Sequence, residues 1–436
     1  MEKRVIQVEE RLPLLQTVPL SLQHLFAMFG ATVLVPFLFQ VNPATSLLMN
    51  GIGTLIYIYF AEGRIPAYLG SSFAFIAPVL AVIGRPGMGY ASAQGGFMLF
   101  GLFFIVVSFI IRIVGVRWID IIFPPAAMGA IVAVIGLELA PMATNMAGLT
   151  GKTIEQLNIP YGPAIAVSTF TLGVAIVGSV VFRGFWAVIP ILIGVISGYF
   201  LSLIVGIVDL KGVAGAPWFE VPTFYSPVFQ LDAILMIMPA ALVVLAEHIG
   251  HLVVTGHIVG RDLVRNPGLH RSLLGDGISN MLSGLVGATP NTTYGENIGV
   301  MAITKVFSVW VIGGAAIIAI GISMVGKLSA LIRSIPVPVM GGVCILLFGT
   351  IAAAGIRMLI EKRVDYTKSK NLILTSVVLI SGISGTAVRL GAVELKGMAL
   401  GTVVAILISL TFNLFDKLGW TNSAEIAAPT IHVPDE

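Results

Sequence analysis

Charged side chains are scarce in this sequence. Only 10% of its 436 residues are Asp, Glu, Lys or Arg, whereas 57% are hydrophobic and the mean hydropathy is +1.00. A water-soluble protein carries roughly 25% charged residues. The scarcity therefore excludes a soluble globular protein and predicts an all-α polytopic membrane protein.

Cysteine is almost absent. Cys344 is the single cysteine, which excludes an internal disulfide and a cysteine-built metal site. The segment 247–251, Glu-His-Ile-Gly-His, differs from the His-Glu-x-x-His order of a zinc peptidase. Because the sequence offers no nucleophile–base or metal constellation, an enzyme is the weakest interpretation. We expect no metal, no cofactor and no nucleic-acid partner.

The sequence shows no cleavable signal peptide and no soluble domain, so we expect neither. Residues 1–14 are charged and polar and lead directly into an apolar segment of full membrane length. We therefore expect the first span to act as an uncleaved targeting signal. Beyond the spans, the sequence suggests only loops and a short tail at 418–436.

Apolar segments of about 20 residues, the length that crosses a bilayer as a helix, recur along the chain. They predict fourteen transmembrane segments, at 16–39, 43–60, 65–84, 93–115, 119–140, 161–182, 185–208, 232–255, 272–287, 289–306, 308–326, 336–358, 371–390 and 395–415. With the N-terminus inside, the positive-inside rule is satisfied, because the basic residues left outside are only Arg85, Lys152, Lys211, Lys327, Arg333, Arg389 and Lys396. We expect a multi-pass protein of the cytoplasmic (inner) membrane, with both termini cytoplasmic.

Short sequences recur seven spans apart. The matching pairs are 123–129 with 335–341, 23–25 with 247–249, and 70–75 with 287–294. Because seven is odd, the two halves must face opposite ways across the membrane. Inverted repeats with interrupted segments at matching positions are typical of secondary transporters, whose site lies at the midplane.

The stretch 288–305 has the pattern of a broken membrane segment. Residues 290–293, Pro-Asn-Thr-Thr, disfavour a helix before about Tyr294, whereas the residues from Gly295 onward favour one. Such a break survives in lipid only where it is buried in protein or lines a cavity. Glu296 stands at this junction and is a candidate ligand-binding carboxylate. The alternative is an interfacial loop in which Glu296 only caps the helix.

Span 3 offers a matching interruption. Ser72 and Phe73 lie in a segment that Gly70 interrupts, so we expect spans 3 and 10 each to be broken by a short extended strand. Phe73 and Tyr294 would then present ring faces to a flat, hydrogen-bonding ligand. Alternatively, Phe73 only packs near a kink.

Polar side chains also interrupt other spans. Glu247 and His251 are four residues apart on span 8, so they share a helix face and can hydrogen-bond. Such a pair can exchange a proton near neutral pH, as a proton-coupled carrier requires; the alternative is a structural pair that ties two helices together. His24 in span 1 is expected to face inward, either at a ligand or behind the groups that bind it. Glu138 and Asp276 are expected to be structural.

Several motifs resemble the nucleobase–ascorbate transporter family, also called nucleobase:cation symporter family 2. Glu296-Asn297-Ile298-Gly299, followed after four residues by Thr304-Lys305, is similar to the family signature. The resemblance runs through nearly the whole chain. The segments most similar to the bacterial uracil permease branch are 19–24, 67–73, 246–251 and 289–297.

The resemblance implies an architecture. Spans 1–4 (16–115) and 8–11 (232–326) would form a core domain, and spans 5–7 (119–208) and 12–14 (336–415) a gate domain. A homodimer through the gate domain would be expected.

The resemblance also implies uracil uptake driven by protons. Glu247 and Glu296 would bind the polar edge of the ring, and Phe73 and Gly295 would bind it through backbone N–H groups. His251 would be linked to Glu247 and take part in proton coupling.

Phe348 departs from this pattern. It stands where uracil permeases of this branch carry a tyrosine, so the resemblance leaves its contact with substrate open.

The nearest alternative is a transporter of the same architecture with another substrate, such as xanthine, urate or another pyrimidine. Uracil offers two N–H donors and two carbonyl acceptors, which two carboxylates and backbone N–H groups would satisfy in a dry site. A same-fold transporter of sulfate or bicarbonate is disfavoured, because two carboxylates repel an anion. The two-acid site also disfavours a channel.

Overall fold

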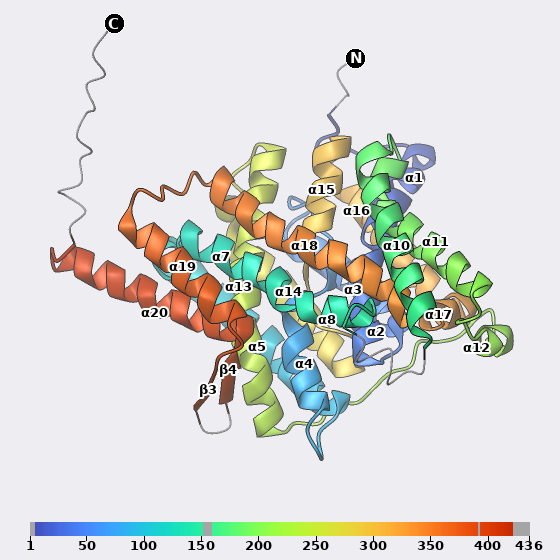
Figure 1. Cartoon of the computed structure of the whole chain (residues 1–436). Helices are drawn as coiled ribbons and strands as arrows, with labels where there is room; N and C mark the ends of the chain where they lie inside the picture. Colours follow the sequence, from blue (N-terminus) through green and yellow to red (C-terminus); the bar gives the residue numbers. More distant parts are fainter. Residues whose placement is uncertain (1–4, 151–158, 391–392, 422–436) are drawn as a thin grey trace, which may run out of the picture.

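The computed structural model describes residues 5–150, 159–390 and 393–421 (Figure 1). Most of the tail expected at 418–436, and the first four residues, lie outside this description. The described chain is largely helical and contains two small two-stranded sheets.

The first half of the chain carries helices that are interrupted early by one short strand. Its elements are α1 (Leu14–Ala27), α2 (Phe29–Phe39), α3 (Pro43–Phe60), β1 (Leu69–Ser71), η1 (Phe73–Phe75), α4 (Ile76–Ile83), α5 (Tyr90–Val114), α6 (Arg117–Ile122), α7 (Pro125–Glu138), α8 (Ala140–Met146), α10 (Tyr161–Val181), η2 (Trp186–Val188), α11 (Pro190–Ile204) and α12 (Lys211–Gly215).

The second half repeats the motif of a strand followed by a helix. Its elements are α13 (Leu231–Val259), η3 (Val264–Gly268), α14 (Leu269–Val286), β2 (Asn291–Thr293), α15 (Gly295–Thr304), α16 (Val309–Ser323), α17 (Gly326–Arg333), α18 (Val337–Glu361), α19 (Ser369–Ile383), β3 (Ala387–Leu390), β4 (Val393–Lys396) and α20 (Gly397–Lys417).

Helix length and composition support a polytopic membrane protein. In the described residues, six helices are long and apolar enough to cross a membrane, and α1 with α2, which meet at 42°, would make a seventh. This number is smaller than the fourteen spans expected from the sequence, in part because four apolar helices have only 10–17 residues. These are Phe73–Ile83, Pro190–Ile204, Val309–Ser323 and Ser369–Ile383.

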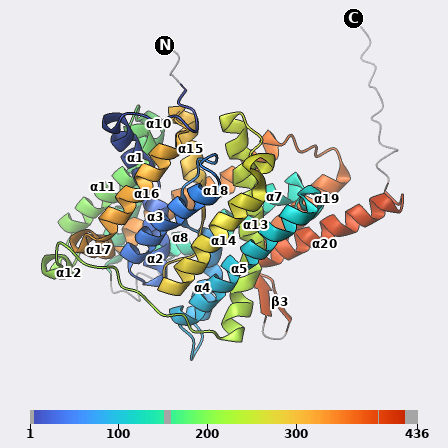
Figure 2. The same ribbon diagram turned by 180° about the vertical axis from the view of Figure 1, so that it is seen from behind.

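The helices form two packed groups. Helices α16, α3, α14 and α5 lie in a row, each in contact with the next (Figure 2). In the other group α7 contacts α18, α19 and α20, and α10 packs between α11 and α18. Helix α13 touches both groups, through α5 on one side and α7 and α20 on the other. Residues on α13 therefore lie where the two groups meet.

Strands β1 and β2 pair although they are far apart in the sequence. The pairing is antiparallel, with Leu69 opposite Thr293 and Ser71 opposite Asn291. Flanking bonds extend it, since Ser72 N donates to Pro290 O at 2.8 Å. A break in a helix leaves backbone groups without partners, which is costly in an apolar interior. Cross-pairing of the two breaks satisfies those groups, and it brings the starts of η1 and α15 together.

The segment before α1 forms backbone hydrogen bonds with the connection between α15 and α16. Ile6 N donates to Lys305 O, Phe307 N donates to Ile6 O, and Val309 N donates to Val8 O, each at 2.9 Å. Val8 is completely buried. The N-terminal segment thus holds the end of α15 in place.

An ion pair connects the same segment to the end of α13. Arg261 binds Glu9 with both terminal nitrogens, and Nη2 lies 2.8 Å from Oε2. The hydrogen bond from Arg261 keeps the pKa of Glu9 below its ordinary value. A carboxylate with a lowered pKa stabilises the folded state above its unfolded-state pKa, and this stabilisation is lost as the pH falls through the lowered value.

We predict that Glu9→Gln loosens the attachment at neutral pH. Amide exchange at Phe307 and Val309 should become up to about five-fold faster, because exposed ion pairs contribute about 0.2–1 kcal/mol. The difference from the unaltered protein should vanish in acid. Hydrogen exchange followed by mass spectrometry at both pH values measures this. Glu361→Gln, which removes an exposed pair with Arg357 on α18, is the matched control; equal exchange in both variants would contradict the prediction.

Candidate functional site

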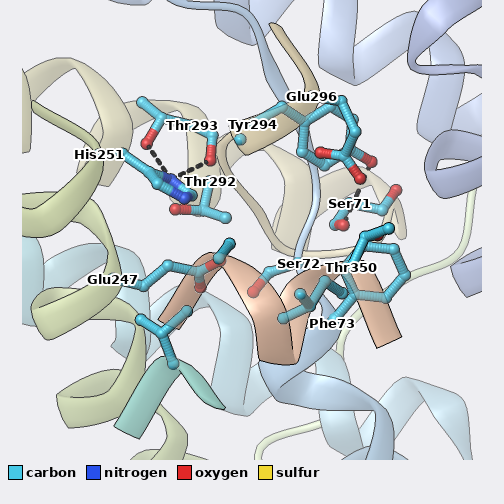
Figure 3. A pocket seen from close by; sticks show the side chains of 14 residues that line it. Ser71, Ser72, Phe73, Glu247, His251, Thr292, Thr293, Tyr294, Glu296 and Thr350 are labelled. Carbon is cyan, nitrogen blue, oxygen red and sulfur yellow. Dashed lines mark hydrogen bonds between the residues drawn. The ribbon is translucent and has the colours of Figure 1, made fainter. Parts of the chain in front are cut away.

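The two strands and α13 enclose a cavity of about 190 Å³ against the second group of helices (Figure 3). It lies between the paired breaks and receives side chains from both halves of the chain. The lining residues are Ser71, Ser72, Phe73, Val132, Glu247, His251, Thr292, Thr293, Tyr294, Gly295, Glu296, Thr350, Ile351 and Ala354. The five expected substrate-binding residues, together with His251 and Ser72, are therefore brought to one cavity.

Glu247 supplies one carboxylate of the cavity, from the middle of α13. Its side chain is almost fully buried, and Oε2 has no hydrogen-bond partner in the described residues. A buried polar atom without a partner costs roughly 1–3 kcal/mol. The arrangement is therefore that of a group that meets a ligand or a proton in this cavity.

The expected hydrogen bond between Glu247 and His251 is absent from the described structure, so that prediction was wrong. His251 Nδ1 instead lies 2.8 Å from the carbonyl oxygen of Thr293 and 3.2 Å from Thr293 Oγ1 (Figure 3). The helical spacing placed both side chains on one face, but the carbonyl of β2 offers the imidazole an acceptor in fixed position. His251 thus ties α13 to β2.

Glu296 supplies the second carboxylate. It lies in the first turn of α15, after Tyr294 as the N-cap residue and Gly295 as the first helical residue. The first N–H groups of a helix have no partner within it and favour negative charge nearby. Gly295 is also sterically constrained, because a Cβ atom there would come within 3.3 Å of His251 Nε2. A larger residue would displace the imidazole.

Tyr294 borders the cavity and also packs its ring against β1. Its ring packs on Gly70, where a Cβ atom would come within 2.1 Å of the ring. Its hydroxyl donates to Ser71 O at 3.2 Å, and the side chain is 3% exposed. Tyr294 therefore locks β1 onto the start of α15 while it borders the cavity.

Phe73 borders the cavity and rests on Phe348. The two rings meet edge to face with their centres 6.0 Å apart. Phe348 is fully buried and is not among the lining residues. It therefore orients Phe73 from behind. Ser72, the neighbour of Phe73, lines the cavity directly.

His24 lies behind α15 and does not line the cavity. Its Nδ1 is 2.9 Å from Asn297 Oδ1, and Asn297 Nδ2 donates to Pro66 O at 3.3 Å. Both side chains are buried. His24 thus supports the helix turn that carries Glu296.

A buried network of polar side chains supports strand β2. His248 Nε2 lies 2.7 Å from Ser272 Oγ, and His248 Nδ1 lies 2.9 Å from Asp276 Oδ2, at an angle outside hydrogen-bond geometry. Asn280 Nδ2 donates to Asp276 Oδ1, and Asn291 N donates to Asn280 Oδ1 at 2.7 Å. Asp276 therefore lies within a network that connects α13 and α14 to β2.

Glu138 lies outside the cavity. Its Oε2 accepts a hydrogen bond from Met398 N at 2.7 Å, at the start of α20. It thus caps that helix and joins α7 to it. No group of three or more metal-binding side chains occurs in the part of the chain that the structure describes.

Sequence reasoning missed several lining residues. Thr292 was treated only as helix-disfavouring, and Val132, Thr350, Ile351 and Ala354 were not considered. Period-two alternation within the short strand offered a signal for Thr292, because alternate strand side chains point to opposite faces. The residues on α7 and α18 carry no such signal, since only packing of the second helix group brings them there.

A comparison with protein families identifies the chain. The profile of a family described as a permease family matches residues 15–391. The chain belongs to this family, the nucleobase–ascorbate transporters.

Close relatives of this permease are similar along their whole length. It is 62% identical to the uracil permease of Paenibacillus larvae subsp. larvae, over 97% of this chain and 100% of the relative. It is also 62% identical to the uracil permease of Escherichia coli K12, over 96% of both chains.

A solved structure shows the fold of this permease. The transmembrane domain of a cyanobacterial bicarbonate transporter, BicA, superposes with a TM-score of 0.61 at 17% identity, over 93% of this chain and 99% of that one. The helical polytopic membrane fold is thus shared with a protein of very different sequence.

Proposed function

We propose that this permease is a secondary active transporter that imports uracil together with protons. The observation that carries the proposal is the pair of carboxylates, Glu247 and Glu296, that line one cavity from two different elements. Carboxylates accept the N–H donors of a nucleobase. The names of the two close relatives add support for uracil.

The cavity has room for a pyrimidine ring. An apolar cavity of about 150 Å³ is sufficient to bind benzene, and this one measures about 190 Å³. A bicarbonate-type substrate is disfavoured despite the fold shared with BicA, because carboxylates on two walls would repel an anion.

The full architecture that we propose has fourteen spans in two inverted halves. Two strand breaks that pair with each other, each followed by a helix start, support it. Spans 1–4 and 8–11 would form the core domain and the others the gate domain. Helix α13, which carries Glu247 between the two packed groups, would place the site at their junction. We further propose a homodimer through the gate domain, in the cytoplasmic membrane, with both termini cytoplasmic.

Proton coupling is assigned to Glu247. A carboxyl group that is neutral crosses an apolar interior at much lower cost than a carboxylate. Since Glu247 Oε2 has no protein partner in the described residues, one oxygen of the carboxyl group would carry the proton while the other accepts a ligand N–H. His251, which is bonded to β2, would hold the geometry of the cavity while the proton is exchanged.

Uptake by purified protein in proteoliposomes tests the proposal. We expect labelled uracil to accumulate against its gradient when the outside is more acidic than the inside, and only to equilibrate without a pH gradient. Unlabelled uracil should compete strongly, and xanthine and urate weakly. Accumulation that ignores the pH gradient would contradict proton coupling, and absence of saturable uracil uptake would contradict the substrate.

A further inference from the structure

Two side-chain hydroxyls on the cavity wall have no hydrogen-bond partner in the described residues. They belong to Ser72, which follows β1, and to Thr292, which is the central residue of β2. Both residues are almost fully buried, with exposed fractions of 0% and 2%. A buried hydroxyl that lacks a partner costs roughly 1–3 kcal/mol, and because both residues line the cavity, each hydroxyl is available to a partner that enters it.

The other hydroxyls of the same cavity are already used within the protein. Ser71 Oγ lies 2.7 Å from Thr289 Oγ1, Thr293 Oγ1 lies 3.2 Å from His251 Nδ1, and Thr350 Oγ1 donates to Leu347 O at 2.8 Å. Thr292 is therefore distinguished from its neighbours in the strand by an unused hydroxyl.

The strand geometry explains why Thr292 differs from the residues beside it. Side chains alternate along a strand, so those of Asn291 and Thr293 lie on the face opposite to Thr292. Asn291 bonds to Ser279 on α14 and Thr293 meets His251 on α13. Opposite Thr292 in the register stands Gly70, which has no side chain to meet the hydroxyl. The view in Figure 3 places Thr292 on the same side of the cavity as Glu247.

We propose that Thr292 Oγ1 donates a hydrogen bond to a carbonyl oxygen of the transported ring and so determines specificity for a carbonyl-bearing pyrimidine. This rests on the proposed function. A ring carbonyl oxygen has two lone pairs and accepts up to two hydrogen bonds. A hydroxyl on a rigid strand therefore supplies a donor in fixed position, in addition to the backbone N–H groups expected at Phe73 and Gly295.

The test compares Thr292→Val, which removes the hydroxyl but keeps the branched shape that suits a strand, with Thr292→Ser, which keeps the hydroxyl. Equilibrium binding of uracil, 2-thiouracil and 4-thiouracil to the purified full-length protein is measured for each. We expect Thr292→Val to bind uracil about ten-fold more weakly, because the ring oxygen loses a hydrogen-bond donor, and Thr292→Ser to stay within about three-fold of the unaltered protein.

The thio analogues separate a contact from a merely structural effect. Sulfur is a weak acceptor, so the loss caused by Thr292→Val should largely disappear for the analogue whose sulfur replaces the contacted oxygen and persist for the other. Thr411→Val on α20, whose hydroxyl donates to Leu407 O outside the cavity, is the control and should bind all three ligands normally.

The outcomes distinguish this inference from the proposed function. If the unaltered protein fails to bind uracil, the proposed function is overturned and this inference with it. If the unaltered protein binds uracil and Thr292→Val binds it equally well, only the inference is overturned. An equal loss for uracil and both thio analogues would likewise reject the contact and make Thr292 a structural residue.

Discussion

Glu296→Ala is expected to abolish uracil binding while the protein still folds and reaches the membrane. Glu296 lines the cavity from the first turn of α15, where no other side chain replaces its carboxylate. Loss of one partner of a buried charged hydrogen bond costs roughly 2–5 kcal/mol, which corresponds to a decrease in affinity of about 30-fold or more. Isothermal titration of the purified variant with uracil measures the effect.

Two controls accompany this variant. Glu361→Ala removes an exposed carboxylate from α18 that lies outside the cavity and should bind uracil normally. Thermal unfolding in detergent should give similar midpoints for both variants, because the start of α15 remains held by the strand pair and by Asn297. Near-normal affinity in folded Glu296→Ala would remove Glu296 from the site.

Glu247→Gln is expected to lose uracil accumulation driven by a pH gradient. Glutamine imitates the protonated carboxyl group in shape, but it can neither release nor accept a proton. Because the variant has the neutral form permanently, its cavity should still bind uracil and allow exchange across the membrane. The uracil level inside the vesicles should fall to the level reached without a gradient, whereas the unaltered protein is expected to concentrate uracil.

The measurement is initial uptake into proteoliposomes between about pH 5 and 8, with internal and external pH set separately. Counterflow of labelled against unlabelled uracil in the same vesicles shows that the variant still carries substrate. Glu138→Gln is the control. It removes a carboxylate that lies outside the cavity, and it should keep the response to the gradient. If Glu247→Gln still concentrates uracil in an inward proton gradient, the coupling site lies elsewhere.

The membrane location, the family and the main carboxylates could be predicted from the sequence because each leaves a local mark. A helix that crosses a bilayer needs about 20 mostly apolar residues, and such segments are visible in the sequence. Pro290 and the short polar residues after it end one regular structure, so the start of α15 at Gly295 followed directly. Glu247 and Glu296 stood out because an ionised carboxylate within a membrane segment is energetically unfavourable and therefore indicates a functional site.

The partners of those residues were less predictable. The i, i+4 spacing made a Glu247–His251 bond plausible, yet the imidazole is satisfied by Thr293 in β2. Spacing along a helix states which side chains share a face, but not what an unrelated segment places against that face. The same limit applies to His248, whose partners on α14 lie 24 and 28 positions away in the chain.

The sequence by itself determined that this chain is a membrane protein of the nucleobase–ascorbate transporter family. Only the tertiary structure decided that β1 and β2 pair with Leu69 opposite Thr293, and that Thr292 keeps an unused hydroxyl in the cavity. It also decided that Phe348 supports Phe73 from behind. Composition and motifs act through local propensity and burial, whereas the partner of each polar group is set by contacts between segments distant in the chain.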